Sequence, residues 1–500
     1  MVDQEPESRR PRRALAPGAG GDPATAEGED TQILPRTRRG GSVNRSGFDD
    51  DEQYDGADEP RTTHRTRLAL VVAGVAAVVV LGLAIGYSVL NLGSTSPAAP
   101  RAPGPTMAAS AGSATPTVNA DVLLSDAAML SAAQAKQVAA DRTWKVALTQ
   151  RGTDDSSPQP ACLDSSAVAG QPPAQQSVLR LLSASGKQPP GILHRADGYA
   201  TPEEATVAFD LAAEQLGDCM MTGGYLESGA RVSGVGDEAA GVVVAVVTGS
   251  STQRHTVVLS RTGRLVNVVD VAAAAAARAV PLAGVAKALA GVTGVQCRPA
   301  GGRCAGAVAV KPGPPPLGAD QPGFLSTGDL PPVGSPATTW AGTVPAPPDA
   351  DFTGSGCETV SWARVPATRR TSRTYLLQDQ SPTFGLDDIV ITSKKPAEAA
   401  ALAQRVRKDL DSCAKRKLTA KVSKPAPVSG VGAGGARIEG WTAVVSQRTT
   451  AGTARYRVGV VSVGAKTVFT FLNPQPKLDL SDDQWDTVAV RAAQRASQLS

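Results

Sequence analysis

The second half of the chain repeats a pattern of rare residues found in the first half. The offset between matched positions stays between 194 and 201 residues over more than 100 positions. The string VSGVG occurs at 232–236 and again at 428–432. The other matched pairs are Leu124 and Leu325, Trp144 and Trp340, Cys162 and Cys357, Pro202 and Pro396, and Cys219 and Cys413. An internal repeat of this length predicts two copies of one domain.

A Pro-rich run separates the two copies. Residues 311–316 read KPGPPP, a composition typical of linkers. We therefore expect copy 1 to cover 118–307, a Pro/Gly linker to cover 308–321, and copy 2 to cover 322–500.

Each copy is predicted to be α+β. In copy 1, 201–204 read TPEE, which is a helix start with Thr at the cap and Pro at the first position. Apolar residues then recur at helical spacing from Ala205 to Cys219, and copy 2 has a similar helix after Ser393. Strands are expected at 241–248, 255–260, 265–271, 438–446, 457–463 and 467–472, and closing helices at 282–292 and 483–499. This order predicts two antiparallel sheets, each with its helices on one face.

An uncharged run at 68–90 predicts a single transmembrane helix. At about 1.5 Å per residue, it is long enough to cross a hydrocarbon core of roughly 30 Å. Arg61, Arg65 and Arg67 precede the run, whereas only Arg101 follows it closely. The positive-inside rule then places the N-terminus in the cytoplasm and 118–500 outside the cell membrane. A Pro/Ala/Ser-rich spacer, 91–117, would connect the helix to copy 1.

The first 67 residues have the composition of a disordered cytoplasmic tail. They are rich in charge, Pro and Gly, and they lack the large apolar residues of a core. Glu27, Glu29 and Asp30 precede Thr31, which resembles the acidic Thr-Gln sites used by actinobacterial Ser/Thr kinases. Thr31 is therefore a candidate phosphorylation site for a cytosolic kinase and a phosphothreonine-binding domain, and an unmodified threonine is the alternative.

The six cysteines are predicted to form three disulfides. Six cysteines allow 15 pairings, but Cys162 and Cys219 recur at nearly the same separation as Cys357 and Cys413. One disulfide in each copy is the simplest explanation. Cys297 and Cys304 remain and would close a small local loop. A zinc site is the alternative, but the sequence has no CxxC and no histidine near these cysteines.

These features together resemble the PknH-like extracellular sensor domain of actinobacterial membrane proteins. The resemblance rests on Leu123–Ser125, Cys219, the 232–239 loop and the 255–271 hairpin, and it covers about 118–304 and, more weakly, 322–500. It implies an antiparallel sheet with flanking helices and a ligand-binding cleft, without a catalytic residue. The chain departs from the family in having no kinase domain. Copy 2 also has one cysteine pair, where the resemblance implies two.

No motif for catalysis, cofactor binding or metal binding is present in the sequence. GxGxxG, the P-loop pattern, HExxH and GxSxG are all missing from their expected contexts. His64, His194 and His255 have no neighbouring partners in sequence, and Asp237-Glu238 has no counterpart in copy 2. Trp441 and Trp485 are specific to copy 2 and are expected in its core.

Two classes of function remain after these exclusions. With 50 basic and 46 acidic residues, the chain lacks the charge excess of a nucleic-acid binder. The first hypothesis is a non-enzymatic membrane protein whose two domains bind an envelope ligand or protein, mainly through copy 1, without a cofactor. The second is an envelope hydrolase whose active site has no local motif.

Overall fold

The computed structural model describes residues 123–499, except 155, 164–167, 276, 319, 379–383 and 451. The predicted tail with Thr31 and His64, the apolar run 68–90 and the spacer 91–117 lie outside the described residues. Within the described ranges, no helix is long and apolar enough to cross a membrane.

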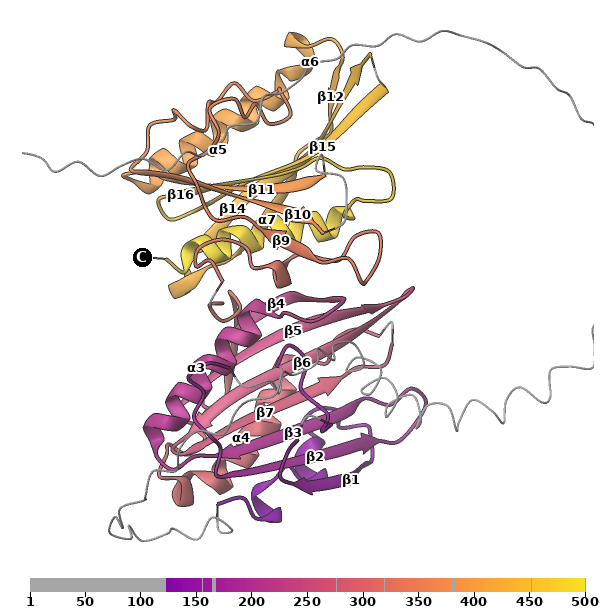
Figure 1. The fold of residues 1–500 in the computed structure, drawn as a ribbon, viewed down its shortest axis with the longest axis vertical. Coiled ribbons are helices and arrows are strands. Elements are labelled where there is room, and N and C mark those ends of the chain that lie inside the picture. The colour runs from indigo at the N-terminus through magenta and orange to yellow at the C-terminus, as the bar shows by residue number, and fades with distance from the viewer. Residues whose placement is uncertain are drawn as a thin grey trace, which may run out of the picture. The chain divides into compact units, whose positions relative to one another are not determined.

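Copy 1 folds around an eight-stranded antiparallel sheet with the order β1-β2-β3-β7-β6-β5-β4-β8 (Figure 1). Its strands are β1 (Trp144–Arg151), β2 (Gln176–Ala184), β3 (Gly191–Gly198), β4 (Gly224–Ser233), β5 (Glu238–Thr248), β6 (Ser251–Thr262), β7 (Leu265–Ala272) and β8 (Ala309–Gly313). Its helices are η2 (Asp126–Ala128), α2 (Ala132–Ala135), α3 (Pro202–Asp218) and α4 (Leu282–Ala300). As predicted, Thr201 caps α3 by accepting a hydrogen bond from the Glu204 amide.

Copy 2 repeats this topology. Its sheet runs β12-β14-β15-β16-β11-β10-β9, with β13 also paired to β14. Its strands are β9 (Trp340–Gly342), β10 (Arg369–Leu377), β11 (Gly385–Thr392), β12 (Ala420–Val422), β13 (Ala426–Val431), β14 (Arg437–Thr449), β15 (Gly452–Val463) and β16 (Lys466–Leu472). Its helices are η3 (Thr327–Asp329), α5 (Pro396–Asp411), α6 (Cys413–Arg416), η4 (Ala433–Gly435) and α7 (Asp482–Ser497). The shared strand order supports the duplication and the α+β class.

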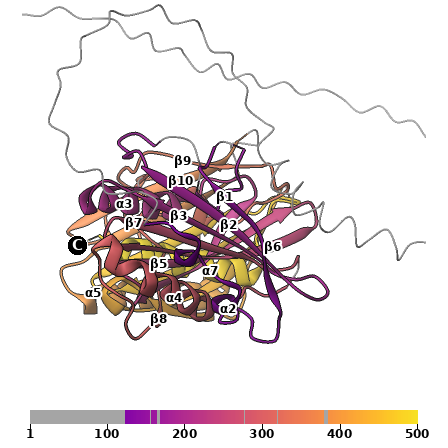
Figure 2. The ribbon, with the colours of Figure 1, turned by 90° about the horizontal axis from the view of Figure 1, so that it is seen from below.

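The helices cover both faces of each sheet, so the prediction of helices on one face is wrong. In copy 1, α3 packs on a face that includes Val257 and Val268, whereas α4 packs on the opposite face with Val258 and Val269 (Figure 2). In copy 2, α5 and α7 divide the two faces in the same way. The physical reason is that the central strands are apolar at both alternating positions; every residue of β7 is buried.

The first sheet extends into the segment predicted as a linker. Residues 309–313 form β8, which pairs with β4 from Gly229↔Gly313 to Ser233↔Ala309. Pro312 fits there because β8 is an edge strand, where one side of the backbone needs no partner. The predicted boundary of copy 1 at residue 307 is therefore too early.

Three disulfides confirm the predicted cysteine pairing. They join Cys162 to Cys219, Cys297 to Cys304, and Cys357 to Cys413, which leaves no free cysteine in the described residues. The two repeated bridges each connect the end of a long helix to the loop before the second strand of the sheet. Disulfides of this number are typical of an oxidising, extracytoplasmic compartment.

Candidate functional site

A groove lies between the two copies, next to the Cys162–Cys219 disulfide. α3 ends at Asp218, and Cys219 follows in the left-handed conformation with a φ of 44°. The turn over 220–223 then leads into β4 and forms one wall. The other wall comes from η3 and the start of β9. The groove has a volume of about 260 Å³, which is near the lower limit for small-molecule sites.

The lining of this groove is uncharged and combines polar with apolar surface. Four threonines and Gln378 supply polar side chains, but none of the described lining residues is Asp, Glu, Lys, Arg or His. The large apolar side chains of the lining are Met220, Met221, Leu330, Pro332 and Trp340. Such a surface binds through apolar contact and a few hydrogen bonds, and it offers no group that transfers a proton near neutral pH.

Arg495 joins the two walls of the groove. It projects from α7 of copy 2, where Nη2 donates to the Gly217 carbonyl at 2.5 Å and Nη1 donates to the Pro316 carbonyl at 2.6 Å. Ser326 Oγ donates to the same Gly217 carbonyl. A guanidinium at the C-terminal end of α3 is favourable because that end carries the partial negative charge of the helix dipole.

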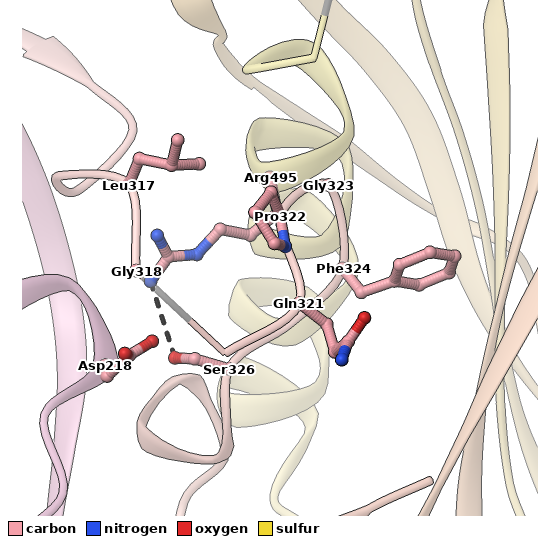
Figure 3. Close-up of a pocket in the computed structure, with 9 residues that line it drawn as sticks. All are labelled: Asp218, Leu317, Gly318, Gln321, Pro322, Gly323, Phe324, Ser326 and Arg495. Atoms are coloured by element: carbon pink, nitrogen blue, oxygen red, sulfur yellow. Dashed lines mark hydrogen bonds between the residues drawn. The ribbon is translucent and has the colours of Figure 1, made fainter. Parts of the chain in front are cut away.

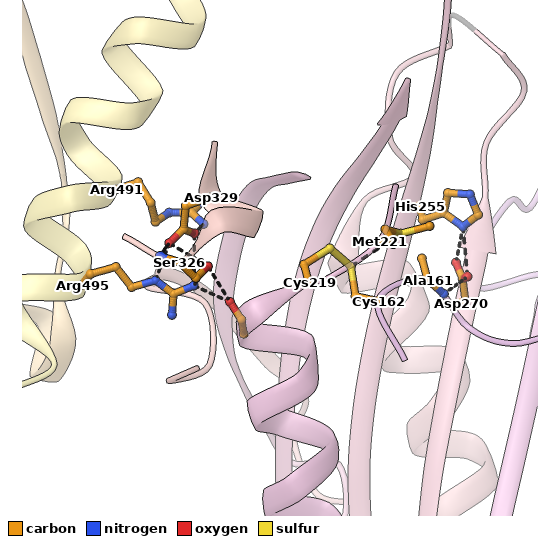
Figure 4. Close-up of a disulfide and its surroundings, with 11 residues drawn as sticks. Ala161, Cys162, Cys219, Met221, His255, Asp270, Ser326, Asp329, Arg491 and Arg495 are labelled. Carbon is orange, nitrogen blue, oxygen red and sulfur yellow. Dashed lines mark hydrogen bonds and ion pairs between the residues drawn. A yellow bond between two sulfur atoms is a disulfide. The ribbon is translucent and has the colours of Figure 1, made fainter. Parts of the chain in front are cut away.

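The charge of Arg495 is balanced by Asp329 in η3 (Figure 4). Asp329 is fully buried and accepts from Arg495 Nε at 2.7 Å and from Arg491 Nη1 at 2.9 Å. Burial alone would raise the pKa of Asp329, but the charges of the two arginines and their hydrogen bonds lower it. The carboxylate is therefore ionised, and the cluster holds η3 against α7.

A smaller cavity next to Arg495 is too small to hold a ligand. It is lined in part by Asp218, Phe324 and Ser326 (Figure 3), and its volume is about 10 Å³. A cavity of this size holds about one water molecule. Of the two cavities, the groove is the candidate ligand site.

His255 and Asp270 form a buried pair on β6 and β7 of copy 1. His255 Nδ1 lies 2.9 Å from Asp270 Oδ2, and the Ala161 amide donates to the same oxygen (Figure 4). Burial alone would lower the pKa of His255, but the adjacent carboxylate raises it. Among the described residues, no Ser, Thr or Cys side chain has a hydrogen bond to this imidazole. The pair therefore lacks a positioned nucleophile, and its hydrogen bond to Ala161 holds the loop that carries Cys162.

The two copies place different titratable groups at one equivalent buried position. His194 on β3 lies opposite Arg180 on β2, and Asp388 on β11 lies opposite Arg373 on β10. His194 Nδ1 accepts from the Leu130 amide, and Asp388 Oδ2 accepts from the Leu325 amide. Desolvation lowers the pKa of His194 to about 4 and raises the pKa of Asp388 to about 7. Both groups are thus mainly neutral in the folded protein at mildly acidic pH.

These two groups should give the copies opposite pH dependences. Between about pH 4 and 6.5, unfolded copy 1 binds more protons at His194 than folded copy 1, so its free energy of unfolding should rise with pH. Between about pH 3.8 and 7, folded copy 2 binds more protons at Asp388 than unfolded copy 2, so its free energy of unfolding should fall as pH rises.

Urea denaturation at several pH values, compared with His194→Gln and Asp388→Asn, measures this dependence. Each substitution should remove the contribution of its own titratable group. The difference in unfolding free energy between wild type and His194→Gln should therefore rise with pH, whereas the difference for Asp388→Asn should fall with pH. Slopes of the same sign would contradict the assignment.

Asp237 and Glu238 hold the fold of copy 1 and do not face the groove. Asp237 Oδ2 accepts from the Gly263 amide at 2.7 Å and Oδ1 accepts from the Arg303 amide at 2.8 Å. Glu238 pairs with Arg261. These contacts tie the 232–239 loop to the β6–β7 turn and to the Cys297–Cys304 loop.

The groove has no local sequence motif because its walls are more than 100 residues apart. In the sequence, Trp340 stands out only because it matches a tryptophan of copy 1 in the repeat. Met220 and Met221 stand out only because the segment after the matching cysteine of copy 2 is rich in lysine. Trp441 and Trp485 are buried in copy 2, as expected. Within the described ranges, no group of three potential metal ligands occurs.

Comparison of the chain with known proteins finds no matching family model, no matching curated protein and no matching solved structure. The resemblance to PknH-like sensor domains therefore stays a prediction, and the geometry of the groove is the main observation about function.

Proposed function

We propose that 118–500 is a non-enzymatic, sensor-like binding unit outside the cell membrane, with its ligand site in the groove between the copies. The observation that carries this proposal is the lining, which combines apolar side chains with threonine hydroxyls and no ionisable group. The ligand that fits is an uncharged, mostly apolar group from the cell envelope, small enough for about 260 Å³. The hydrogen bonds of Arg495 also support the proposal. They hold the walls of the groove in place, and a rigid site loses less conformational entropy when a ligand binds.

The apolar run 68–90 serves as the membrane anchor in this proposal. The full chain should then stay with the membrane fraction after alkaline extraction, and release into the supernatant would contradict an integral anchor. The three disulfides support placing 118–500 on the oxidising side.

Filling the groove tests the proposed site. The probe is an organic-solvent extract of the cell envelope, added to the full chain in a thermal-shift measurement. A ligand at 100 times its Kd stabilises the folded form by about 2.7 kcal/mol, which should raise the melting temperature. Thr222→Trp places a bulky ring in the groove and should abolish the shift.

Thr453→Trp is the matched control, because Thr453 is an exposed residue of β15 outside the groove. It should keep the full shift. Loss of the shift in both variants, or in neither, would place binding elsewhere.

The hydrolase alternative is favoured by one observation, the His255–Asp270 pair. A carboxylate that orients an imidazole is the arrangement of a general base. If the extract is chemically transformed by the wild type and not by His255→Gln, the hydrolase replaces the binding proposal.

A further inference from the structure

The segment after the helix-terminal cysteine differs between the copies in charge and surroundings. In copy 1, 220–224 read MMTGG and line the groove against copy 2. In copy 2, the corresponding 414–424 read AKRKLTAKVSK. Leu418 in this segment is 89% exposed, the highest value among the large apolar side chains of the described residues. The segment is thus uncharged in copy 1 and basic in copy 2.

Basic residues flank Leu418 along the chain. Lys415, Lys417, Lys421 and Lys424 are all exposed, and the sequence has no Asp or Glu between Asp411 and Glu439. The Arg448 amide donates to the Thr419 carbonyl at 3.0 Å, which brings this exposed arginine to the same turn. We name this surface the basic cap: Lys415, Lys417, Leu418, Lys421, Lys424 and Arg448.

The acidic side chains nearest to the basic cap, in sequence and in the adjoining loop, already have other hydrogen-bond or ion-pair partners. Asp409 accepts from the amide and hydroxyl of Thr359. Asp411 pairs with Arg407, and Glu358 accepts from Ser355. None of these described carboxylates has an ion pair with a lysine of the basic cap. Its positive charge therefore remains available to a partner.

The turn that carries Leu418 is braced on both sides. Arg416 Nη2 donates to the Cys357 carbonyl at 2.7 Å, so it holds the turn and is left out of the cap. β12 pairs with β14 through Ala420↔Gln447 and Val422↔Val445. The Cys357–Cys413 disulfide fixes the start of α6. The exposed leucine is thus displayed from an anchored segment.

We infer that the basic cap docks on an anionic lipid bilayer. Lysines near an anionic membrane surface are attracted to its headgroups. An apolar side chain between them gains free energy by entering the boundary between headgroups and acyl chains, whereas a soluble anion offers Leu418 no such environment. The cap lies outside the groove, so this inference does not depend on the proposed ligand site.

The experiment uses the full chain held in phosphatidylcholine nanodiscs and flowed over immobilised vesicles. The test vesicles contain about 30% phosphatidylglycerol, which gives an anionic surface, and the reference vesicles are pure phosphatidylcholine. Binding should require the anionic lipid. Lys417→Gln/Lys421→Gln should weaken it roughly 30-fold, because each lysine contributes about 1 kcal/mol and 1.4 kcal/mol is tenfold.

Two matched controls make the result specific. Lys394→Gln/Lys395→Gln removes the same charge at the opposite end of α5, from exposed positions, and should leave binding within about twofold. Leu418→Ser should weaken binding roughly tenfold, whereas Val344→Ser, at another highly exposed apolar side chain, should not. Equal losses in both lysine pairs would overturn the inference. So would an unchanged Leu418→Ser, since the cap would then recognise charge alone.

Discussion

Replacing Asp329 by Asn should lower the free energy of unfolding of copy 2 by about 3–5 kcal/mol, because it leaves two buried guanidinium groups without a counter-charge. Asp329, Arg491 and Arg495 are all buried, so water cannot solvate the unpaired charges. The change should be measured by urea denaturation followed through tryptophan fluorescence, since four of the five tryptophans belong to copy 2.

Asp411→Asn is the matched control for this prediction. Asp411 is half exposed and pairs with Arg407 at 3.8 Å on the surface of α5. Exposed pairs of this kind contribute about 0.3–0.5 kcal/mol. Equal effects at Asp329 and Asp411 would contradict the role assigned to the buried cluster.

The second large effect is expected from the repeated disulfides. Replacing Cys357 and Cys413 by Ala should cost about 4 kcal/mol, because the bridge closes a long loop in the unfolded chain. The Cys162–Cys219 bridge has a sequence separation of 57, against 56 for the Cys357–Cys413 bridge, and should contribute a similar amount to stability. The Cys297–Cys304 bridge, with a separation of 7, should contribute about 2.5 kcal/mol by the same relation.

Denaturation of the three double-alanine variants tests this order directly. The Cys297–Cys304 variant is the internal control, since it differs mainly in loop length. Non-reducing peptide mapping of protein taken from intact cells gives the second measurement. Three intact bridges are expected, and six free thiols would place the domains in a reducing compartment, against the proposed location.

Local signals in the sequence predict much of each copy. Thr201 and Pro202 mark the start of α3 because capping depends on adjacent residues. The repeat of Cys162 and Cys219 in Cys357 and Cys413 predicts the disulfides, because one connectivity satisfies both copies.

The features that the sequence does not predict depend on contacts between distant segments. β8 has a linker composition, and only its pairing with β4 makes it a strand. The helices cover both faces of each sheet because the central strands are apolar throughout. Such a sequence pattern does not tell whether one face of the sheet is buried or both. The groove needs Met220 and Trp340 from different copies, and Arg495 brings these walls together from the end of the chain.

The central claim is that the groove binds an envelope ligand without transforming it, and fluorine NMR of the full chain labelled with 5-fluorotryptophan tests it most directly. Trp340 lines the groove, whereas Trp362 and Trp441 are buried in copy 2 in the core cluster on the other face of its sheet. Trp340→Phe assigns the relevant resonance. Adding the envelope extract should shift the Trp340 resonance, leave those of Trp362 and Trp441 in place, and leave the extract chemically unchanged. An unmoved Trp340 resonance under conditions that stabilise the protein, or turnover of the extract, would contradict the claim.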